Sequence, residues 1–301
     1  MTIRTFDQLL AAAQEKGPKR VAIVFAHEPN TLQAVHQAHE RGLAECILIG
    51  DAAAIHETAT IQRLNLEPAQ VIQENYPDEA AQRAVELINA HEADLAMNGL
   101  AQPRYLIEAA LDRTHGLRTG RLLTDVSIFE IPNMDRLILI SDIGIVVSPT
   151  MEQRIGIVRN AVEVAHALGI EQPKVAILAA TEMVNPKIPL SMEAANLSKM
   201  AQRGQIKGAL IDGPLALDNA ISPEAARIKG IESDVAGHAD ILIAPDIEAG
   251  NILAKTIIYF AKGKMAGVVV GGRCPLVLPS RSDPPETKLV SMALGIYLSE
   301  G

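Results

Sequence analysis

Short apolar runs alternate with helix-like stretches along the whole chain, and this alternation is the strongest constraint on its fold. The apolar runs predict strands at 21–25, 46–49, 95–97, 126–131, 137–141, 175–178, 208–211, 241–244, 267–270 and 276–278. Helical spacing between them predicts helices at 30–41, 78–90, 151–168, 191–203, 223–229 and 249–261, with further helices at the two ends of the chain. Strands that alternate with helices of this length form βαβ units. The sequence therefore predicts an α/β fold with mostly parallel sheets and flanking helices.

One pair of strands departs from this alternation. IFEIP and RLILIS are separated only by Asn133-Met134-Asp135, which predicts a hairpin. A hinge is expected just after this pair, near 142–150, where it would divide the chain into two comparable halves.

Charge and composition exclude several classes of protein. The net charge of −9 argues against binding to a nucleic-acid backbone. No apolar run is long enough to span a membrane, and the N-terminal stretch lacks the apolar core of a signal peptide. Cys46 and Cys274 have no metal-ligand spacing, and packing is the favoured role for both. These features indicate a cytoplasmic protein that makes no membrane contact.

Well-known catalytic fingerprints are missing from the sequence. It contains no GxGxxG, GxxxxGK[ST] or GxSxG motif, which disfavours dinucleotide, P-loop and serine-hydrolase sites. The histidines are scattered, and Asp212 and Asp218 have no third carboxylate at a suitable spacing. No metal site is predicted, and Asp218 with Asn219 is better explained by capping and turn formation.

The C-terminal stretch 271–295 contains the best candidate for an anion site. It reads as an apolar strand, a polar tip with Ser280 and Arg281, and an amphipathic helix. A guanidinium beside a hydroxyl at a strand-to-helix junction is suited to phosphate. The helix start has its own pattern, with Asp283 as N-cap, Pro284 as the first helical residue and Glu286 as the third, so capping competes with catalysis for both carboxylates.

Two other loops carry polar side chains suited to a ligand. GLRTGRLLTD places Arg118 and Thr124 in a glycine-rich loop, which either binds an anion or is a solvated connector. ADILIAPDIEAGNILAK places Asp246 and Asn251 after a strand, at the edge of an α/β sheet where ligands bind. Gly250 within that helix indicates either close packing or close approach of a ligand.

Together, these segments resemble the phosphate butyryltransferases and, more distantly, the phosphate acetyltransferases. The resemblance rests on GLRTGRL, VVSPTMEQ, RGQIKGALIDGPLALDNAIS, ADILIAPDIEAGNILAK and SRSDPPETK, which follow the same order as in the family, and it covers essentially the whole chain. It implies two α/β domains arranged as in isocitrate and isopropylmalate dehydrogenases. The first would comprise 1–145 and 281–301, the second 146–280, with the active cleft between them.

The implied reaction converts an acyl-CoA and phosphate reversibly into an acyl phosphate and CoA, without an acyl-enzyme. The resemblance assigns phosphate binding to Arg281, a hydrogen bond at the reacting centre to Ser280, and substrate contacts to Thr124 and the loop Ser148-Pro149-Thr150. Arg118, Asp246 and Asn251 complete the expected substrate-binding set. Acetyl-transferring relatives carry a proposed base where this chain has Thr287. Glu286 is therefore the candidate base, with Asp283 as the other nearby carboxylate.

The motif RGQIKG…IDGP…ALDNAIS favours the butyryl branch, so a short- or branched-chain acyl-CoA is expected, with acetyl-CoA as the alternative. CoA is expected as a substrate, with no permanently bound cofactor, and a homodimer or larger homo-oligomer is implied. Two other hypotheses are a related dehydrogenase, which should need an aspartate metal site and a nicotinamide site, and a CoA-binding regulator without turnover.

Overall fold

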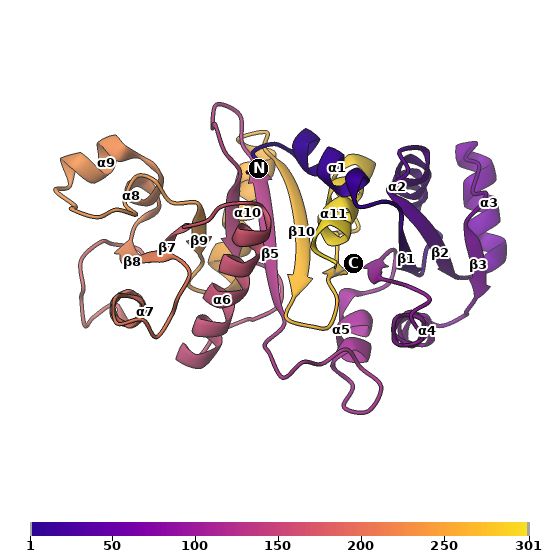
Figure 1. The fold of residues 1–301 in the computed structure, drawn as a ribbon, viewed down its shortest axis with the longest axis horizontal. Helices are drawn as coiled ribbons and strands as arrows, with labels where there is room; N and C mark the ends of the chain where they lie inside the picture. The colour runs from indigo at the N-terminus through magenta and orange to yellow at the C-terminus, as the bar shows by residue number, and fades with distance from the viewer. Residues whose placement is uncertain (1, 300–301) are drawn as a thin grey trace. The chain divides into compact units, whose positions relative to one another are not determined.

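The computed structural model describes residues 2–299, which form two compact units (Figure 1). We call Phe6–Arg121 together with 266–299 the terminal unit, and Leu122–Met265 together with 2–5 the central unit. Both units are built from β-strands with helices packed on them, as the alternating sequence pattern predicts.

The terminal unit contains the chain from Phe6 to Arg121 and the C-terminal end of the described chain. Its helices are α1 (Phe6–Glu15), α2 (Pro29–Glu40), α3 (Ala52–Gln62), α4 (Pro77–Asn89), α5 (Pro103–Leu111) and α11 (Pro285–Leu298). Its strands are β1 (Lys19–Val24), β2 (Ala44–Gly50), β3 (Gln70–Gln73), β4 (Leu95–Asn98), β10 (Lys264–Val270, which begins in the central unit) and β11 (Leu276–Val277). They lie in the order β3-β2-β1-β4-β11-β10, and every neighbouring pair except β11–β10 is parallel.

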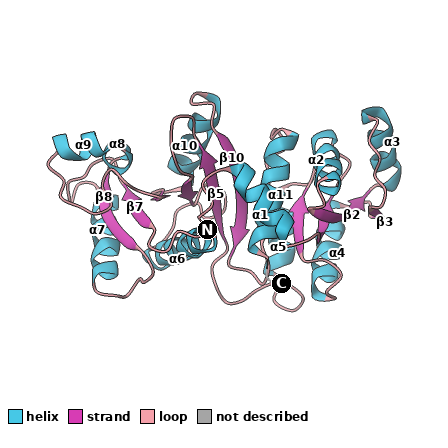
Figure 2. Ribbon diagram, turned by 45° about the horizontal axis from the view of Figure 1, so that its top comes forward, coloured by secondary structure: helices cyan, strands magenta, loops and turns pink. Residues whose placement is uncertain are grey.

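Alternate residues of β1 and β4 point to opposite faces of this sheet. Val21, Ile23 and Leu95 join a buried cluster with residues of α1, α2 and α11. Helix α4 packs against β1, β2 and β4 and also contacts α5. Figure 1 shows α1, α2 and α11 above the strands of this sheet and α4 and α5 below them, and Figure 2 draws the same helices in cyan from another side. The sheet is thus covered by helices on both faces.

The central unit holds the other ten elements. Its strands are β5 (Thr124–Glu130), β6 (Ile138–Ser141), β7 (Lys174–Leu178), β8 (Leu210–Leu215) and β9 (Ile241–Ile243), in the order β5-β6-β9-β7-β8. Its helices are α6 (Met151–Ala167), α7 (Pro189–Gln202), α8 (Leu217–Ile221), α9 (Pro223–Ile228) and α10 (Ile247–Tyr259). The β5–β6 pair is antiparallel and the other pairs are parallel, so the predicted hairpin is confirmed.

The boundaries of these units differ from the predicted domain boundaries after residues 145 and 280. The compact units divide between Arg121 and Leu122 and between Met265 and Ala266. The reason is pairing: β6 pairs with β9 and α6 packs on β5, β6 and β9, so the hairpin belongs with the central unit. Likewise, β11 pairs with β4, so the stretch that leads to Ser280 belongs with the terminal unit.

Candidate functional site

Three loops meet at one edge of the terminal unit's sheet. Strands β1, β4 and β11 are parallel and adjacent, so the segments that follow their carboxyl ends lie side by side. These segments are the β1–α2 loop with Glu28, the β4–α5 loop that begins after Asn98, and the β11–α11 loop with Ser280 and Arg281. The sheet edge that favours ligands in open α/β folds is therefore where this chain carries its predicted phosphate-binding tip.

Asp283 fixes the conformation of this tip. Its carboxylate accepts a hydrogen bond from the Ser280 backbone N–H at 2.8 Å, and its own N–H donates to the Ser280 carbonyl at 3.0 Å. The Ser280 and Ser282 hydroxyls are 3.0 Å apart. Asp283 is buried while Ser282 is exposed. The carboxylate thus closes a tight turn, and the tip is held as a small ring of hydrogen bonds.

The predicted capping pattern of α11 is wrong by one residue. The N-cap is Pro284 and the first helical residue is Pro285, with no side-chain cap. The residue before a proline is disfavoured in the α region, so Pro285 keeps Pro284 extended and out of the helix. The Asp283 carboxylate therefore accepts its hydrogen bond from the tip rather than from the backbone of the helix. Glu286, the candidate base, lies exposed at the second helical position.

A fully buried lysine lies beneath the tip. The Lys288 ammonium donates to the Ser280 carbonyl at 3.3 Å and lies 3.4 Å from a carboxylate oxygen of Glu28. Glu28 in turn caps α2, accepting from the backbone N–H groups of Asn30 and Thr31 and from the Thr31 hydroxyl. Lys288 therefore ties the tip to the start of α2.

Burial alone would raise the pKa of Glu28. The Thr31 hydroxyl, the charge of Lys288 and the two backbone N–H groups outweigh burial and lower the pKa below its ordinary value. Glu28 is consequently an anion at neutral pH, matched to the buried ammonium of Lys288.

The Arg281 side chain is exposed at the tip. It makes no ion pair or hydrogen bond with any residue from 2 to 299. Because a guanidinium offers planar donors that fit phosphate oxygens, Arg281 is poised to bind an anion from solution.

The predicted residues of the central unit also gather at one edge of a sheet. β6 and β9 are parallel and β5 runs opposite to β6, so the start of β5 lies beside the ends of β6 and β9. Three of the predicted site segments lie at these strand ends. Thr124 begins β5, the loop Ser148-Pro149-Thr150 follows β6, and Asp246 follows β9. Asn251, one turn into α10, donates to the Ile143 carbonyl at 3.4 Å.

Several of these side chains already have local partners. Thr124 is buried and its hydroxyl accepts from the Asn160 amide at 2.8 Å. Thr150 forms a capping box with Gln153 at the start of α6, and Asp246 caps α10 by accepting from the Ala249 N–H. Ser148 is exposed. Thr150 and Asn251 are exposed as well, whereas Asp246 is half-buried.

Gly250 packs against the loop after β6. A Cβ added there would lie 2.6 Å from the Asp142 carbonyl oxygen and 3.1 Å from side-chain atoms of Ala244 and Ile143. Of the two explanations that the sequence leaves open, the structure supports close packing.

Sequence reasoning missed a pair of carboxyl groups in the central unit. Asp142 is buried and accepts backbone N–H donors from Asp125, Gly144 and Ile145. Burial, followed by the charge of Asp142, raises the pKa of Asp125 to about 8, and a hydrogen bond from the Ser127 hydroxyl lowers it in part. Asp125 is thus the carboxyl that holds a proton near neutral pH. The sequence pattern does not indicate this pair, because the whole hairpin lies between the two aspartates along the chain.

Arg118 lies elsewhere in the terminal unit. The Arg118 backbone forms an isolated antiparallel β-bridge with Gly272. The neighbouring Thr119 hydroxyl donates a hydrogen bond to the Gly271 carbonyl at 2.6 Å. These glycines precede β11, whereas Ser280 follows it, so the Arg118 backbone is at the opposite edge of the sheet from the tip. Within this unit the fold does not bring Arg118 and Arg281 together.

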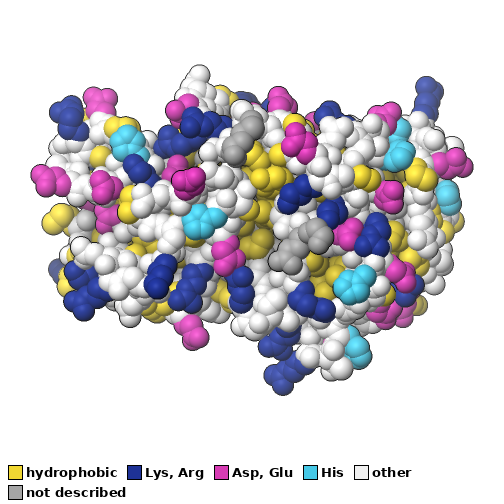
Figure 3. All heavy atoms as spheres, in the orientation of Figure 1, with side chains coloured by type: hydrophobic (Ala, Val, Ile, Leu, Met, Phe, Trp, Pro, Cys, Tyr) yellow, Lys and Arg dark blue, Asp and Glu magenta, His cyan; other side chains and the backbone are white. Residues whose placement is uncertain are grey.

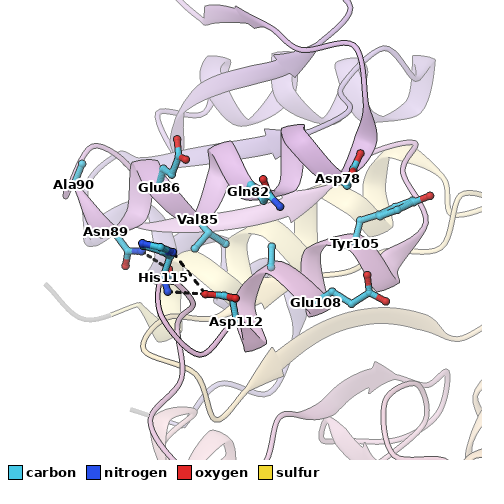
Figure 4. Close-up of a pocket in the computed structure, with 11 residues that line it drawn as sticks. Asp78, Gln82, Val85, Glu86, Asn89, Ala90, Tyr105, Glu108, Asp112 and His115 are labelled. Carbon is cyan, nitrogen blue, oxygen red and sulfur yellow. Dashed lines mark hydrogen bonds and ion pairs between the residues drawn. The ribbon is translucent and has the colours of Figure 1, made fainter.

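A groove of about 630 Å³ lies between α4 and α5, but its charge is unsuited to phosphate (Figure 4). Asp78, Glu86, Glu108 and Asp112 line it, and Asp112 is paired with His115. Anionic substrates would be repelled by these carboxylates. None of the predicted site residues lines this groove.

Two further findings concern the described residues only. Between residues 2 and 299 no three His, Cys, Asp or Glu side chains are grouped so as to hold a metal ion. No helix in that range has the length and apolar character needed to cross a membrane.

Comparison with known proteins identifies the family of the chain. The family model for phosphate acetyl/butaryl transferase matches residues 5–82 and 73–296. The chain is 42% identical over 297 residues to the phosphate butyryltransferase of Clostridium acetobutylicum, covering 99% of both chains. It is 46% identical over 290 residues to the phosphate acetyltransferase of Thermotoga maritima, covering 96% of this chain and 97% of that one.

Solved structures agree with this assignment. A branched-chain phosphotransacylase from Enterococcus faecalis matches with a TM-score of 0.81 and 32% identity, covering 93% of this chain and 98% of that one. A 4-hydroxythreonine-4-phosphate dehydrogenase from Klebsiella pneumoniae shares the fold alone, with a TM-score of 0.55 and 12% identity, covering 94% of this chain and 100% of that one. With a family model and relatives that match nearly its full length, this chain belongs to the family of phosphate acetyl- and butyryltransferases.

Proposed function

We infer that this protein is a phosphate acyltransferase that interconverts acyl-CoA and phosphate with acyl phosphate and CoA. The near full-length match to the phosphate acetyl- and butyryltransferases carries this conclusion. The exposed Arg281 beside Ser280 supports it, because the reaction needs a place for a phosphate group.

In the direction of acyl-CoA synthesis, the CoA sulfur attacks the carbonyl carbon of the acyl phosphate. The new C–S bond forms, the C–O bond to phosphate breaks, and the thiol proton passes to a base. Arg281 would bind the phosphate group and offset its growing charge, and the Ser280 hydroxyl would donate a hydrogen bond at the reacting centre. A thiol with a pKa of about 8.5 is mostly protonated at neutral pH, so the base contributes to the rate.

The proposed transfer is direct, without an acyl-enzyme. The two cysteines support this, since a nucleophilic cysteine requires a low pKa. Burial raises the pKa of Cys46 to about 12, and burial likewise raises the pKa of Cys274 to about 12. Neither thiol would supply a thiolate at neutral pH.

The assignment of Glu286 as the base stays a prediction. Its exposed position leaves the carboxylate free of capping bonds among the described residues, which favours a chemical role over a structural one. The substrate contacts predicted for Arg118, Thr124, Ser148, Pro149, Thr150, Asp246 and Asn251 likewise stay predictions.

The finer description of the fold rests on the resemblance. Two α/β domains in a dehydrogenase-like arrangement, with the active cleft between them, stay a prediction, and the fold shared with a 4-hydroxythreonine-4-phosphate dehydrogenase supports it. The sequence relatives support acyl transfer rather than the dehydrogenase hypothesis, because they are phosphate acetyl- and butyryltransferases.

We propose a short- or branched-chain acyl group, with butyryl preferred. Relatives named for butyryl and branched-chain transfer support this, and an acetyl-transferring relative of 46% identity supports the alternative. Location in the cytoplasm, a homo-oligomer and the lack of a permanently bound cofactor are further parts of the proposal. In Figure 3 acidic and basic side chains are interspersed on the visible face, which fits a protein without a nucleic-acid partner.

An assay of CoA release tests the function. The protein is mixed with phosphate and acetyl-, propionyl-, butyryl-, isobutyryl- or valeryl-CoA, and free thiol is followed with time. The expected result is phosphate-dependent release with the highest kcat/KM for butyryl- or isobutyryl-CoA. Binding of CoA with no release for any chain length would instead favour a regulator that lacks turnover.

A further inference from the structure

Lys288 is placed where an apolar residue would be expected. It is fully buried on α11, and its neighbour Leu289 belongs to the apolar core of the terminal unit. Removing an ammonium from water is costly, and a buried ion pair is often no more stabilising than apolar packing of similar volume. The pairing with Glu28 alone therefore does not account for a lysine at this position.

The second contact of Lys288 is with the main chain of the tip. The Ser280 carbonyl accepts two hydrogen bonds, from the Lys288 ammonium at 3.3 Å and from the Asp283 N–H at 3.0 Å. Both donors belong to buried residues, so this carbonyl points into the protein.

The direction of that carbonyl determines the direction of the next N–H. The Ser280–Arg281 peptide is not among the cis bonds of the described chain, and in a planar trans peptide the C=O and the following N–H point in opposite directions. The Arg281 N–H therefore points away from the interior. It has no acceptor among residues 2–299, and Arg281 is exposed.

We propose that the outward-pointing Arg281 backbone N–H is an anion donor of the phosphate site, and that Lys288 and Asp283 are positioning residues that aim it. The N–H, the Arg281 guanidinium and the Ser280 hydroxyl come from two consecutive residues, so one phosphate group is within reach of all three. A backbone donor that is already oriented costs no reorganisation during the reaction. This inference rests on the proposed function, because it assigns new roles within that site.

The first experiment measures whether Lys288 affects activity by orienting the backbone N–H of Arg281. Replacing Lys288 by Met alone would leave Glu28 as an unpaired buried anion, so the main variant is Glu28→Gln with Lys288→Met. We expect kcat/KM for phosphate to fall about 10- to 100-fold, because a misaimed donor loses part of the 10²- to 10³-fold effect of one such group. In an Arg281→Ala background, which keeps the backbone N–H and removes only the guanidinium, the same pair of changes is expected to cost a similar factor of about 10- to 100-fold.

The matched control is Arg20→Met, which removes the ion pair between Arg20 and Asp94 at the opposite end of β1. It is expected to lower the melting temperature without changing kcat/KM for phosphate. A loss below about 3-fold in the Arg281→Ala background would show that the pair acts through the guanidinium rather than the N–H, and would overturn the positioning role. Values of kcat/KM within about 2-fold of the wild type for Glu28→Gln/Lys288→Met would overturn it as well.

The second experiment detects the donor itself and needs no turnover. In protein labelled with ¹⁵N-arginine, the Arg281 amide signal is assigned by its loss in Arg281→Lys, and inorganic phosphate is titrated. We expect a saturable shift in the wild type and at least a tenfold weaker response in the Glu28→Gln/Lys288→Met variant. An Arg281 amide that does not shift in an active enzyme would refute this inference and leave the proposed function intact. An amide that shifts in a protein with no acyl transfer would support the anion site and refute the function.

Discussion

Arg281 is the side chain on which the proposed chemistry depends most. It is exposed and has no partner among the described residues, so its replacement should not affect folding. We expect Arg281→Lys to lower kcat about 10²-fold, since lysine cannot reproduce the planar pair of donors. The melting temperature should stay within about 1 °C of the wild type, because surface substitutions change stability little.

The control for the change of side chain is Arg104→Lys, because Arg104 is an exposed arginine of the same unit. Steady-state kinetics with acyl-CoA and phosphate, together with thermal melting, measure both quantities. A variant that loses activity only in proportion to its loss of folded protein would show that Arg281 has a structural role.

Ser280 should contribute less than Arg281. Its hydroxyl lies 3.0 Å from that of Ser282, and we propose that it also donates to the reacting centre. Ser280→Ala is expected to cost about 2 kcal/mol, which is about 30-fold in kcat/KM. Ser282→Ala removes the other hydroxyl of the pair and serves as the control. If both variants lose activity equally, the contact between the hydroxyls rather than a bond to substrate explains the effect.

Asp125 should make stability depend on pH. Burial and the charge of Asp142 raise its pKa to about 8, whereas in the unfolded chain it titrates near its ordinary value of about 3.9. Between these values the native state holds a proton that the unfolded state has released. Stability therefore falls as pH rises from about 4 to about 8.

Asp125→Asn should remove most of this dependence. Between pH 5 and pH 8 the melting temperature of the wild type is expected to fall at least about 3 °C further than that of Asp125→Asn, since 1 kcal/mol corresponds to a few degrees. Asp135→Asn, at an exposed aspartate, should behave like the wild type. Parallel pH profiles for the wild type and Asp125→Asn would show that the carboxyl is ionised throughout.

At the scale of elements, the sequence predicted what short-range patterns determine. Apolar runs such as VAIVF and the hairpin around Asn133 follow from local periodicity and turn residues, and both formed. β3 was missed because QVIQ is a short edge strand with polar ends. The start of α11 shifted by one residue because two successive prolines each satisfy part of the capping pattern.

Contacts between residues that lie far apart along the chain could not be predicted from the sequence. Glu28 and Lys288 come from opposite ends of the chain and meet only because α11 packs beside α2. Asp125 and Asp142 meet only because the hairpin folds back. A pattern of residue types gives no sign of such pairs. The tip itself was predictable, but the groups that hold it were not.

The packing of α10 gives a prediction at this scale. Alanine is the better helix former by about 1 kcal/mol, yet a Cβ at Gly250 would lie 2.6 Å from the Asp142 carbonyl oxygen. Because backbone is the obstacle, we expect Gly250→Ala to destabilise the protein by about 1–3 kcal/mol. Gly156→Ala, where the nearest atoms are 3.3 Å away in the Leu122 side chain, should be near neutral. Urea unfolding gives the free energy of unfolding of both variants. Equal values would mean that the loop after β6 moves to make room for the added Cβ.

At the scale of the whole molecule, direct transfer requires the acyl donor and its acceptor to be bound at the same time. An acyl-enzyme would instead release the first product before the second substrate binds, which gives ping-pong kinetics. The raised pKa values of Cys46 and Cys274 leave neither thiol suited to carry an acyl group. We therefore expect initial-rate plots for acyl-CoA and phosphate to intersect rather than run parallel.

Isotope exchange provides an independent measurement of the same point. Labelled phosphate should enter acyl phosphate only when CoA is present, because without an acyl-enzyme the acyl group has no other acceptor from which to return. Replacing both cysteines by serine should leave the exchange rate with CoA within about 3-fold of the wild type, provided the variant melts cooperatively, since neither thiol would be acylated. Exchange without CoA, together with parallel initial-rate plots, would show that the protein holds the acyl group covalently, and a search for the acylated side chain would then replace the direct mechanism.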